Sequence, residues 1–306
     1  MRTLSLILII LMLSLCYCSQ KRDESDLKRE NIRGQVNTLT MSVYFATEKN
    51  GEPQKDSLRY KRTSKYNDHG NLLEEKYIGS DGNILNKHIY KYDSIGNRIE
   101  LDMYSSVSRD SSVSRITQKF TYKNDAKGRL IETNSFDSHG SLGSKITFKY
   151  DDKGNRIESN GYAPDGRLTG KSTYKNDTKG NLIESNSYAS DGRLTGKSTS
   201  QLDDMGNRIF ESISYDYDGT IRIKNTNKND AKGRQIERNS YGSGSSLTDK
   251  FTYKYDTKGN LVESYNFSLK NTYKYDKYDK TGNWLRQIVF VDDKLSTINE
   301  REIVYY

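Results

Sequence analysis

Cysteine, proline and tryptophan are nearly absent from this chain. Of its 306 residues, two are Cys, two are Pro and one is Trp. The two cysteines, Cys16 and Cys18, both lie at the end of an N-terminal apolar run. The remainder of the chain has no thiol, which excludes a disulfide framework, a zinc–cysteine cluster and a thiol-based enzyme.

Aliphatic residues are also scarce. Hydrophobic residues make up 32% of the chain and charged residues 29%, while Tyr and Gly occur 24 and 23 times. A compact domain of this length normally carries more aliphatic core. Low hydrophobicity with high charge is typical of disordered chains too, but the tyrosines and the strict repeat described next favour an elongated sheet that buries little surface per residue.

One pattern recurs along the chain: an aromatic residue, Asp, two variable residues, Gly, Asn or Arg, a variable residue, and then an aliphatic residue before Glu. Its clearest copy is Tyr255–Glu263. The glycines of successive copies are separated by 26, 32, 26, 26, 26, 27, 26 and 23 residues, and such regularity is the signature of a repeat array. These glycines are Gly70, Gly96, Gly128, Gly154, Gly180, Gly206, Gly233, Gly259 and Gly282.

The residues of the pattern are those of a tight hairpin. Asp accepts hydrogen bonds within the turn, and Gly supplies the positive φ that closes a three-residue loop built on a type I turn. A second Asp-Gly turn follows 12 residues later, at Gly82, Gly166 and Gly192. Connections this short cannot make parallel crossovers. The predicted fold class is therefore all-β: a repetitive antiparallel β-meander forming an elongated, twisted or curled sheet.

The alternation within each copy predicts two unlike faces. One face is expected to be an aromatic ladder, and the other to carry Thr, Lys and one aliphatic residue. In the clearest copy the second face holds Thr252, Lys254 and Val262. The aromatic face is expected to hold Phe251, Tyr253, Tyr255, Leu261, Glu263 and Phe267.

The N-terminus predicts export. Arg2 precedes an apolar run at residues 4–15, which is typical of a signal peptide and too short for a spanning helix. The end of the run resembles a bacterial lipoprotein signal, with Leu15 three residues before Cys18 and Leu13 three before Cys16. The resemblance implies lipidation at Cys18, with Cys16 and plain cleavage after Cys18 as alternatives. The predicted organisation is a signal peptide (1–18), a flexible tether (19–34) and one repeat domain (35–306). The predicted location is the bacterial outer membrane or cell surface as a lipoprotein, or else the periplasm or the medium.

The copies Tyr92–Arg98, Tyr150–Arg156 and Tyr255–Leu261 resemble the YD repeats of the RHS family. The array covers residues 60–290, about three quarters of the chain. In that family, long arrays wind into β-sheet shells, often around a toxin domain, and some have been described as sugar-binding or adhesive. The resemblance implies a bacterial exported protein.

Signs of catalysis are lacking. The sequence shows no Ser/His/Asp arrangement, no metal-spaced cluster and no phosphate loop, so we expect no enzyme, cofactor or metal. The net charge of +8 is spread among Asp and Glu without a basic block, which argues against a nucleic-acid partner. Four tyrosines are candidates for stacking on sugar rings: Tyr92, Tyr150, Tyr253 and Tyr255.

Two functional hypotheses follow. The first is a non-enzymatic surface or periplasmic module that binds or adheres to a polysaccharide or an envelope protein and contacts the membrane only through its lipid anchor. The second is a structural or assembly component, or a remnant of an RHS-type toxin-shell system, without a ligand of its own.

Metabolic labelling tests the predicted anchor. A palmitate analogue should mark the wild-type protein, and Cys18→Ala should abolish the label because the acylated thiol is lost. Label that survives Cys18→Ala but disappears in Cys16→Ala would move the anchor to Cys16. An unlabelled wild-type protein would contradict lipidation altogether.

Overall fold

The computed structural model describes residues 25–106, 114–203 and 207–306. The predicted signal peptide, with Cys16 and Cys18, lies outside these residues. None of the described helical structure has the length and apolar character needed to cross a membrane.

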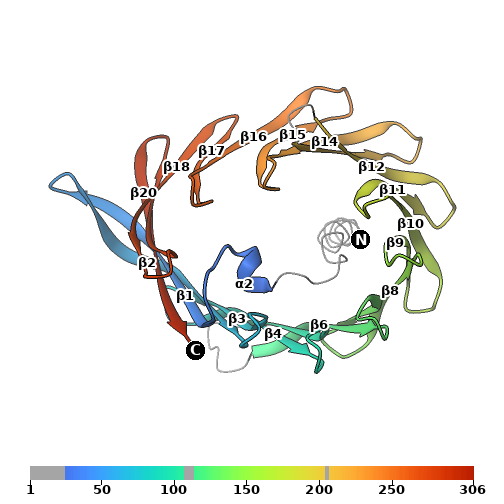
Figure 1. The fold of residues 1–306 in the computed structure, drawn as a ribbon, viewed down its shortest axis with the longest axis horizontal. Helices are drawn as coiled ribbons and strands as arrows, with labels where there is room; N and C mark the ends of the chain where they lie inside the picture. The colour runs from blue at the N-terminus through green and yellow to red at the C-terminus, as the bar shows by residue number, and fades with distance from the viewer. Residues whose placement is uncertain (1–24, 107–113, 204–206) are drawn as a thin grey trace.

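The described residues fold into one short helix and twenty strands (Figure 1). The helix is α2 (Asp26–Arg29). The strands are β1 (Val36–Lys49), β2 (Glu52–Tyr66), β3 (Leu72–Gly79), β4 (Ile84–Tyr92), β5 (Arg98–Ser106), β6 (Ser114–Asn124), β7 (Leu130–Asp137), β8 (Leu142–Tyr150), β9 (Arg156–Tyr162), β10 (Leu168–Asn176), β11 (Leu182–Ala189), β12 (Leu194–Leu202), β13 (Arg208–Tyr215), β14 (Ile221–Asn229), β15 (Gln235–Tyr241), β16 (Leu247–Tyr255), β17 (Leu261–Asn266), β18 (Leu269–Tyr278), β19 (Trp284–Val291) and β20 (Lys294–Tyr305).

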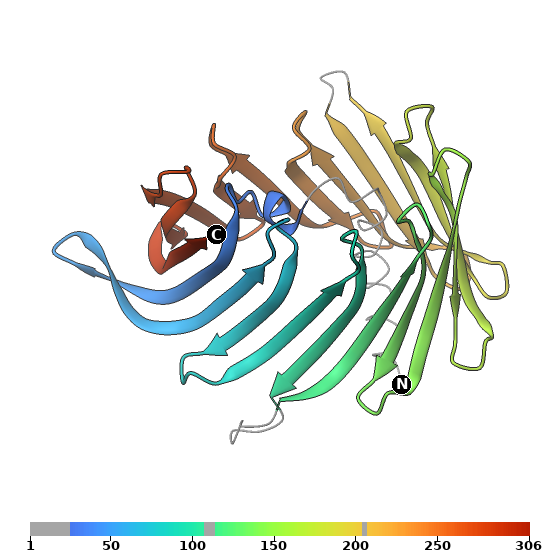
Figure 2. The same cartoon turned by 60° about the horizontal axis from the view of Figure 1, so that its bottom comes forward.

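Every strand pairs antiparallel with the next one along the chain, which confirms the predicted meander. The expectation of an elongated sheet is wrong, because β1 also pairs with β20, from Val36 opposite Tyr305 to Phe45 opposite Thr297. The result is a closed barrel (Figures 1 and 2). Closure satisfies the backbone groups of both sheet edges, and it requires no second sheet and no large aliphatic core.

The turns have the predicted chemistry. In the β8–β9 turn the Gly154 N–H donates to the Asp151 carbonyl (3.0 Å), and Gly154 has φ +87°. The Asp151 carboxylate accepts from the Asn155 N–H (2.7 Å) and from its side-chain amide (3.0 Å). The type I turn closed by a left-handed glycine is therefore confirmed in this copy.

The turn of the clearest copy introduces a bulge that corrects the predicted faces. Tyr255 pairs with Leu261, but the preceding Lys254 pairs with Glu263. Glu263 therefore lies on the lysine face. Phe267 lies in the turn after β17 and is 52% exposed. The extra residue of the bulge reverses which side chains face inward after the turn. Alternation counted along the sequence does not predict this reversal.

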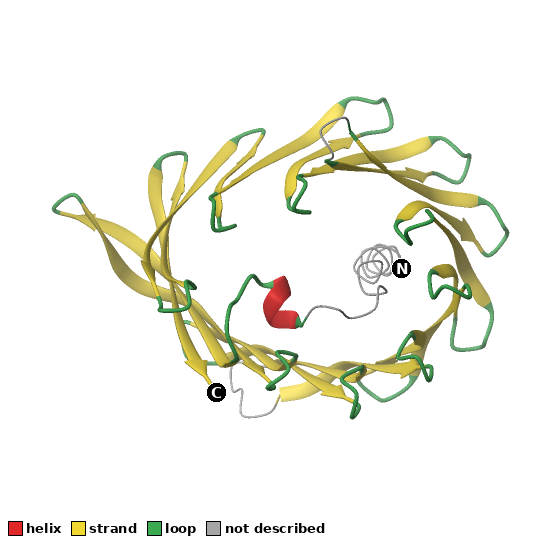
Figure 3. Ribbon diagram, viewed as in Figure 1, coloured by secondary structure: helices red, strands yellow, loops and turns green. Residues whose placement is uncertain are grey.

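The buried core is small and lies beside α2, which is inside the barrel (Figure 3). The Leu27 N–H donates to the Gly70 carbonyl (3.2 Å), which fixes the helix at the β2–β3 turn. The apolar cluster consists of Leu27, Ile32, Val36, Leu39, Tyr66 and Leu72, with Tyr90, Ile303 and Tyr305 packed against it. Residues 25–34 of the predicted tether are thus folded, because Leu27 and Ile32 bury their side chains at the seam.

The segment after α2 is fixed to the β18–β19 turn by one amide side chain. Asn283 accepts from the Arg33 N–H (2.8 Å) and donates to the Arg33 carbonyl (2.9 Å). It also donates to the Tyr305 hydroxyl (2.9 Å) and is only 3% exposed. The first described residues and the last strand are therefore joined at the seam by side chains as well as by the β1–β20 ladder.

Replacing Gly154 with Val should lower the free energy of unfolding by about 1–3 kcal/mol, because a β-branched residue is forced to positive φ. A Cβ at this position has no neighbour within 4 Å, so the cost comes from the backbone alone. Thr147→Val, in the middle of β8, is the matched control and should be nearly neutral. Urea unfolding followed by circular dichroism measures both, and equal losses would contradict the assigned turn.

Asn283→Ala should destabilise the barrel by about 1–3 kcal/mol more than Asn260→Ala, since it breaks two hydrogen bonds to Arg33 in a buried setting. Asn260 occupies the equivalent position in the β16–β17 turn, and among the described residues its side chain bonds to Asp256 alone (2.9 Å). Thermal unfolding of the two variants makes the comparison. Similar midpoints would show that the segment after α2 does not stabilise the seam.

Candidate functional site: the inner face of the barrel

The inner face is the one that contacts α2 and its flanking residues. Arg62, Tyr66 and Tyr92 of this face meet Glu30 and Asp26. At roughly 4.8 Å between strands, twenty strands enclose a diameter of about 30 Å before tilt widens it. Barrels of about sixteen or more strands are too wide for side chains to fill. The inner face is therefore available to a ligand.

Burial differs between the two sides of the barrel. Beside α2, the inner residues Leu39, Ser64 and Tyr66 are almost completely buried. On the far side, Ser172 of β10 and Ser198 of β12 remain half-exposed although they face inward. The sector from β9 to β16 is thus the open part of the inner face.

A charged cluster lies next to α2. Arg62 bridges Glu30 (3.0 Å) and Glu75 (3.4 Å), and the Tyr66 hydroxyl donates to Glu30 (3.4 Å). His88 Nδ1 lies 3.9 Å from Glu75. One guanidinium therefore joins the N-terminal segment to β2 and β3.

Burial controls the titration of this cluster. Burial raises the pKa of the Glu75 carboxyl, with opposition from Arg62 and reinforcement from Glu30. Burial lowers the pKa of His88 below its ordinary 6.5, so the imidazole is mostly neutral at neutral pH. Arg62 is consequently the cation that balances the two carboxylates.

The tyrosines four residues before the turn glycines connect successive repeats. The hydroxyls of Tyr92, Tyr150 and Tyr255 donate to the carbonyls of Leu72 (2.7 Å), Leu130 (2.7 Å) and Gln235 (2.9 Å), each 20 residues earlier. Two asparagines that replace Tyr here also reach a carbonyl of the preceding repeat: Asn124 donates to Arg98 (3.3 Å) and Asn176 to Arg156 (3.1 Å). This position has a structural role in each of these repeats.

All four candidate stacking residues face inward, but the structure does not gather them at one place. Tyr92 is on β4, Tyr150 on β8, and Tyr253 and Tyr255 on β16. Arginines lie over three of the rings: Arg98 lies 6.0 Å from the centroid of Tyr92, Arg129 4.8 Å from that of Tyr150 and Arg234 4.7 Å from that of Tyr255. Tyr253 stacks parallel to Phe251 at 6.4 Å. The Tyr253 hydroxyl does not take part in the tyrosine-to-carbonyl bonds described above. Tyr253 is therefore the best placed of the four to stack on a sugar ring.

Small polar side chains line the open sector and form pairs across strands. Ser172 and Ser187 hydroxyls lie 3.1 Å apart, and Ser240 donates to Asn225 (2.7 Å). Ser159 lies 3.0 Å from the Tyr174 hydroxyl. The open sector thus combines aromatic rings with hydroxyl and amide groups.

A further polar group lies on β18–β20. Gln287 donates to the Tyr275 hydroxyl (2.8 Å) and accepts from Asn299 (2.6 Å). The Arg301 guanidinium lies 3.5 Å from the centroid of the Trp284 ring. The sequence repeat does not predict this group, because its residues lie in the last, irregular repeat.

The outer face is a ladder of ion pairs. Glu158 lies between Lys149 (2.7 Å) and Lys171 (2.7 Å). Hydrogen bonds from Lys149, Lys171 and Asn160 lower the pKa of Glu158 to about 2. The ladder leaves the outer face well solvated, in contrast with the aromatic inner face.

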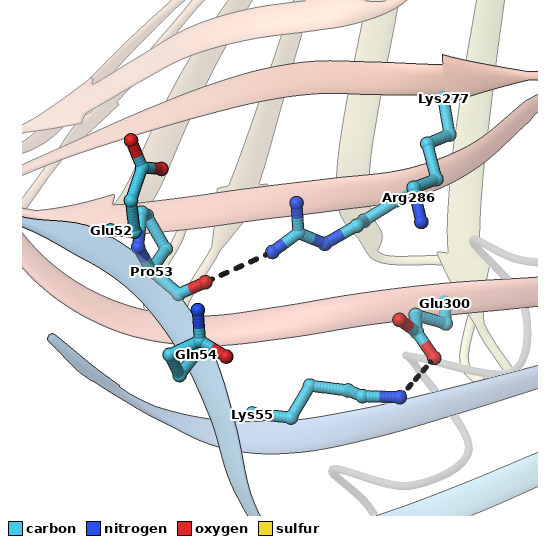
Figure 4. Close-up of a pocket in the computed structure, with 7 residues that line it drawn as sticks. All are labelled: Glu52, Pro53, Gln54, Lys55, Lys277, Arg286 and Glu300. Carbon is cyan, nitrogen blue, oxygen red and sulfur yellow. Dashed lines mark hydrogen bonds and ion pairs between the residues drawn. The ribbon is translucent and has the colours of Figure 1, made fainter. Parts of the chain in front are cut away.

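A cavity of about 420 Å³ lies where the β1–β2 hairpin meets the outer surface of β19 and β20 (Figure 4). Its charges are largely satisfied within the protein. Lys55 pairs with Glu300 (2.8 Å), while Arg286 donates to the Pro53 carbonyl (3.1 Å) and pairs with Asp276. These contacts fix the base of the hairpin. The cavity is lined by Glu52, Pro53, Gln54, Lys55, Lys277, Arg286 and Glu300.

Within residues 25–106, 114–203 and 207–306, no three His, Cys, Asp or Glu side chains come together as a metal site. Sequence reasoning missed the inward-facing arginines and the carboxylates of Asp26 and Glu30. The arginines could have been found from the repeat, since several of them follow the turn glycine directly or by two residues. The two carboxylates could not, because they lie in a stretch of the sequence that has no repeat.

No protein-family model matches the chain, and no curated protein matches it. Among solved structures, a porin-like protein from Bacteroides uniformis is similar with a TM-score of 0.41 and 11% identity, over 88% of this chain and 96% of that one. TcdB2-TccC3-TEV matches with a TM-score of 0.35 and 14% identity, over 80% of this chain and 13% of that one. The Photorhabdus luminescens Tc holotoxin pore matches with a TM-score of 0.25 and 12% identity, over 84% and 18%. The chain spans less than a fifth of the last two.

Proposed function

We propose that this chain is a lipid-anchored, non-enzymatic binding protein of the bacterial envelope, of the YD-repeat type, which holds a glycan against the inner face of its barrel. The observation that carries the proposal is the open sector of that face. Its half-exposed aromatic rings alternate with serine and asparagine groups. Sugars present C–H faces that stack on such rings and hydroxyls that bond to such groups.

The two faces differ in what they can offer a ligand. The outer face carries solvent-exposed Lys–Glu pairs, and such pairs contribute little free energy in water. The inner face is curved around its contents, and a ligand there can contact several strands at once. Repetition of similar side chains suits a polymer of similar units.

Binding of the full chain to a glycan array tests the proposal, with Tyr253→Ser and Tyr265→Ser as a matched pair. Tyr253 faces inward on β16, whereas Tyr265 lies on the outer face of β17 and is 46% exposed. Loss of a contact ring typically costs more than ~1 kcal/mol, so Tyr253→Ser should weaken binding by about fivefold or more. Tyr265→Ser should bind as the parent does.

Two outcomes would contradict glycan binding at the inner face: no glycan retained by the parent, or equal losses in both variants. Capture of an envelope protein in place of a glycan would identify a protein ligand instead.

A second candidate function, an assembly component, is favoured by the β1–β2 hairpin. Beyond Phe45, β1 pairs only with β2, and before Tyr60, β2 pairs only with β1. The hairpin extends from the barrel wall (Figures 1 and 2), and its free edges can accept a strand from another protein. Replacing residues 46–57 with a short turn should abolish partner capture from intact envelopes while leaving glycan binding unchanged, if this function holds.

A further inference from the structure

Arg301 differs from the other charged residues of the inner face. Its guanidinium lies on the Trp284 ring, and it has no carboxylate partner and no hydrogen bond among the described residues. Its Nε is enclosed and unpaired, as is that of Arg62. The difference lies in the terminal nitrogens, since those of Arg62, on the same wall, pair with Glu30 and Glu75.

A half-buried guanidinium without an anion beside it is costly. Burial lowers the pKa of Arg301 to about 10, while Glu30 opposes this effect and Arg62 reinforces it. The group is still charged at neutral pH. An anion that reached it would recover the missing interaction, and a guanidinium favours the planar, two-oxygen geometry of a carboxylate.

The neighbours of Arg301 specify more than a charge. Asn299 lies two residues away on the same strand face, about 7 Å between Cα atoms, and its amide nitrogen donates to Gln287 (2.6 Å). Gln287 in turn donates to Tyr275, whose hydroxyl donates to the Leu261 carbonyl (2.8 Å). This chain of bonds leaves the Asn299 carbonyl oxygen enclosed without a donor. An acceptor without a donor, Asn299 Oδ1, therefore lies beside a guanidinium without an anion, that of Arg301.

We propose that Arg301 and Asn299, oriented by Trp284 and Gln287, bind an acidic sugar residue, with its carboxylate on the guanidinium and a ring hydroxyl donated to Asn299. The inference rests on the proposed glycan-binding function and names the class of glycan, a polyuronate. A sugar acid satisfies both unmet groups. Their polar surroundings of amides and a phenol favour it over a fatty acid, whose tail would require an apolar wall.

The single tryptophan of the chain provides the measurement, because Trp284 lies in the site. The full chain is titrated with oligogalacturonate and with the same oligomer after methyl esterification, and the indole fluorescence is followed. We expect saturable binding of the acid and binding of the ester weaker by about tenfold or more, since esterification removes the charge-assisted pair.

Arg301→Gln should weaken oligogalacturonate binding by about tenfold or more, to the level of the ester. Arg167→Gln, in the exposed turn between β9 and β10, is the matched control and should bind as the parent does. Asn299→Asp covers the case in which Arg301→Gln does not fold. It places a carboxylate of the same shape beside the guanidinium, so uronate binding should be lost because the cation already has an anion.

Equal affinity for acid and ester, or unchanged binding in Asn299→Asp, would overturn the site. A chain that retains neutral glycans on the array but not uronates would overturn this inference and leave the proposed function standing. A chain that retains neither would overturn both. Displacement of the fluorescence signal by a peptide carboxylate, with no response to uronate, would assign the site to a peptide instead.

Discussion

Hydrogen bonding between β1 and β20 is the interaction on which the rest of this structure depends. Every other strand pairing joins neighbours in the sequence, so each could form in an open sheet of any length. The ladder from Val36–Tyr305 to Phe45–Thr297 is the strand pairing that brings the two ends of the array together. Along these residues it removes the exposed sheet edges, which are otherwise sites of uncontrolled strand addition.

Closure also explains how a chain with so few aliphatic residues folds. Stacked sheets need a continuous apolar layer about 10 Å thick. A wide barrel needs only cross-strand contacts and a local seal at the seam. The seal is provided by α2 and residues 30–35, whose Leu27 and Ile32 cover Val36, Leu39 and Tyr66. Elsewhere the tyrosine-to-carbonyl bonds link one repeat to the next without an aliphatic core.

The seam is also where the chemistry departs from the repeat. Arg62 and Glu30 come from the first strands and the N-terminal segment, and Trp284, Asn299 and Arg301 come from the last repeat and β20. Closure places these non-repeated residues on one wall. The repeated residues of β9–β16 form the opposite, open wall, where serines and tyrosines recur at similar positions. The two walls therefore offer different contacts to a polymer: recurring serines and tyrosines on one, and charged side chains on the other.

The sequence alone determined the local structure of this protein. The Asp-to-Gly spacing of Asp151 and Gly154 requires a turn with a left-handed residue, and the alternation of Phe251, Tyr253 and Tyr255 places these rings on one face; both are decided by neighbours within a few residues. Only the tertiary structure decided that the sheet closes, that Glu263 leaves the aromatic face, and that Glu30, Arg62 and Arg301 share one wall. Closure depends on the twist accumulated over twenty strands, which no single repeat encodes, and the pairing of Val36 with Tyr305 joins residues at opposite ends of the chain.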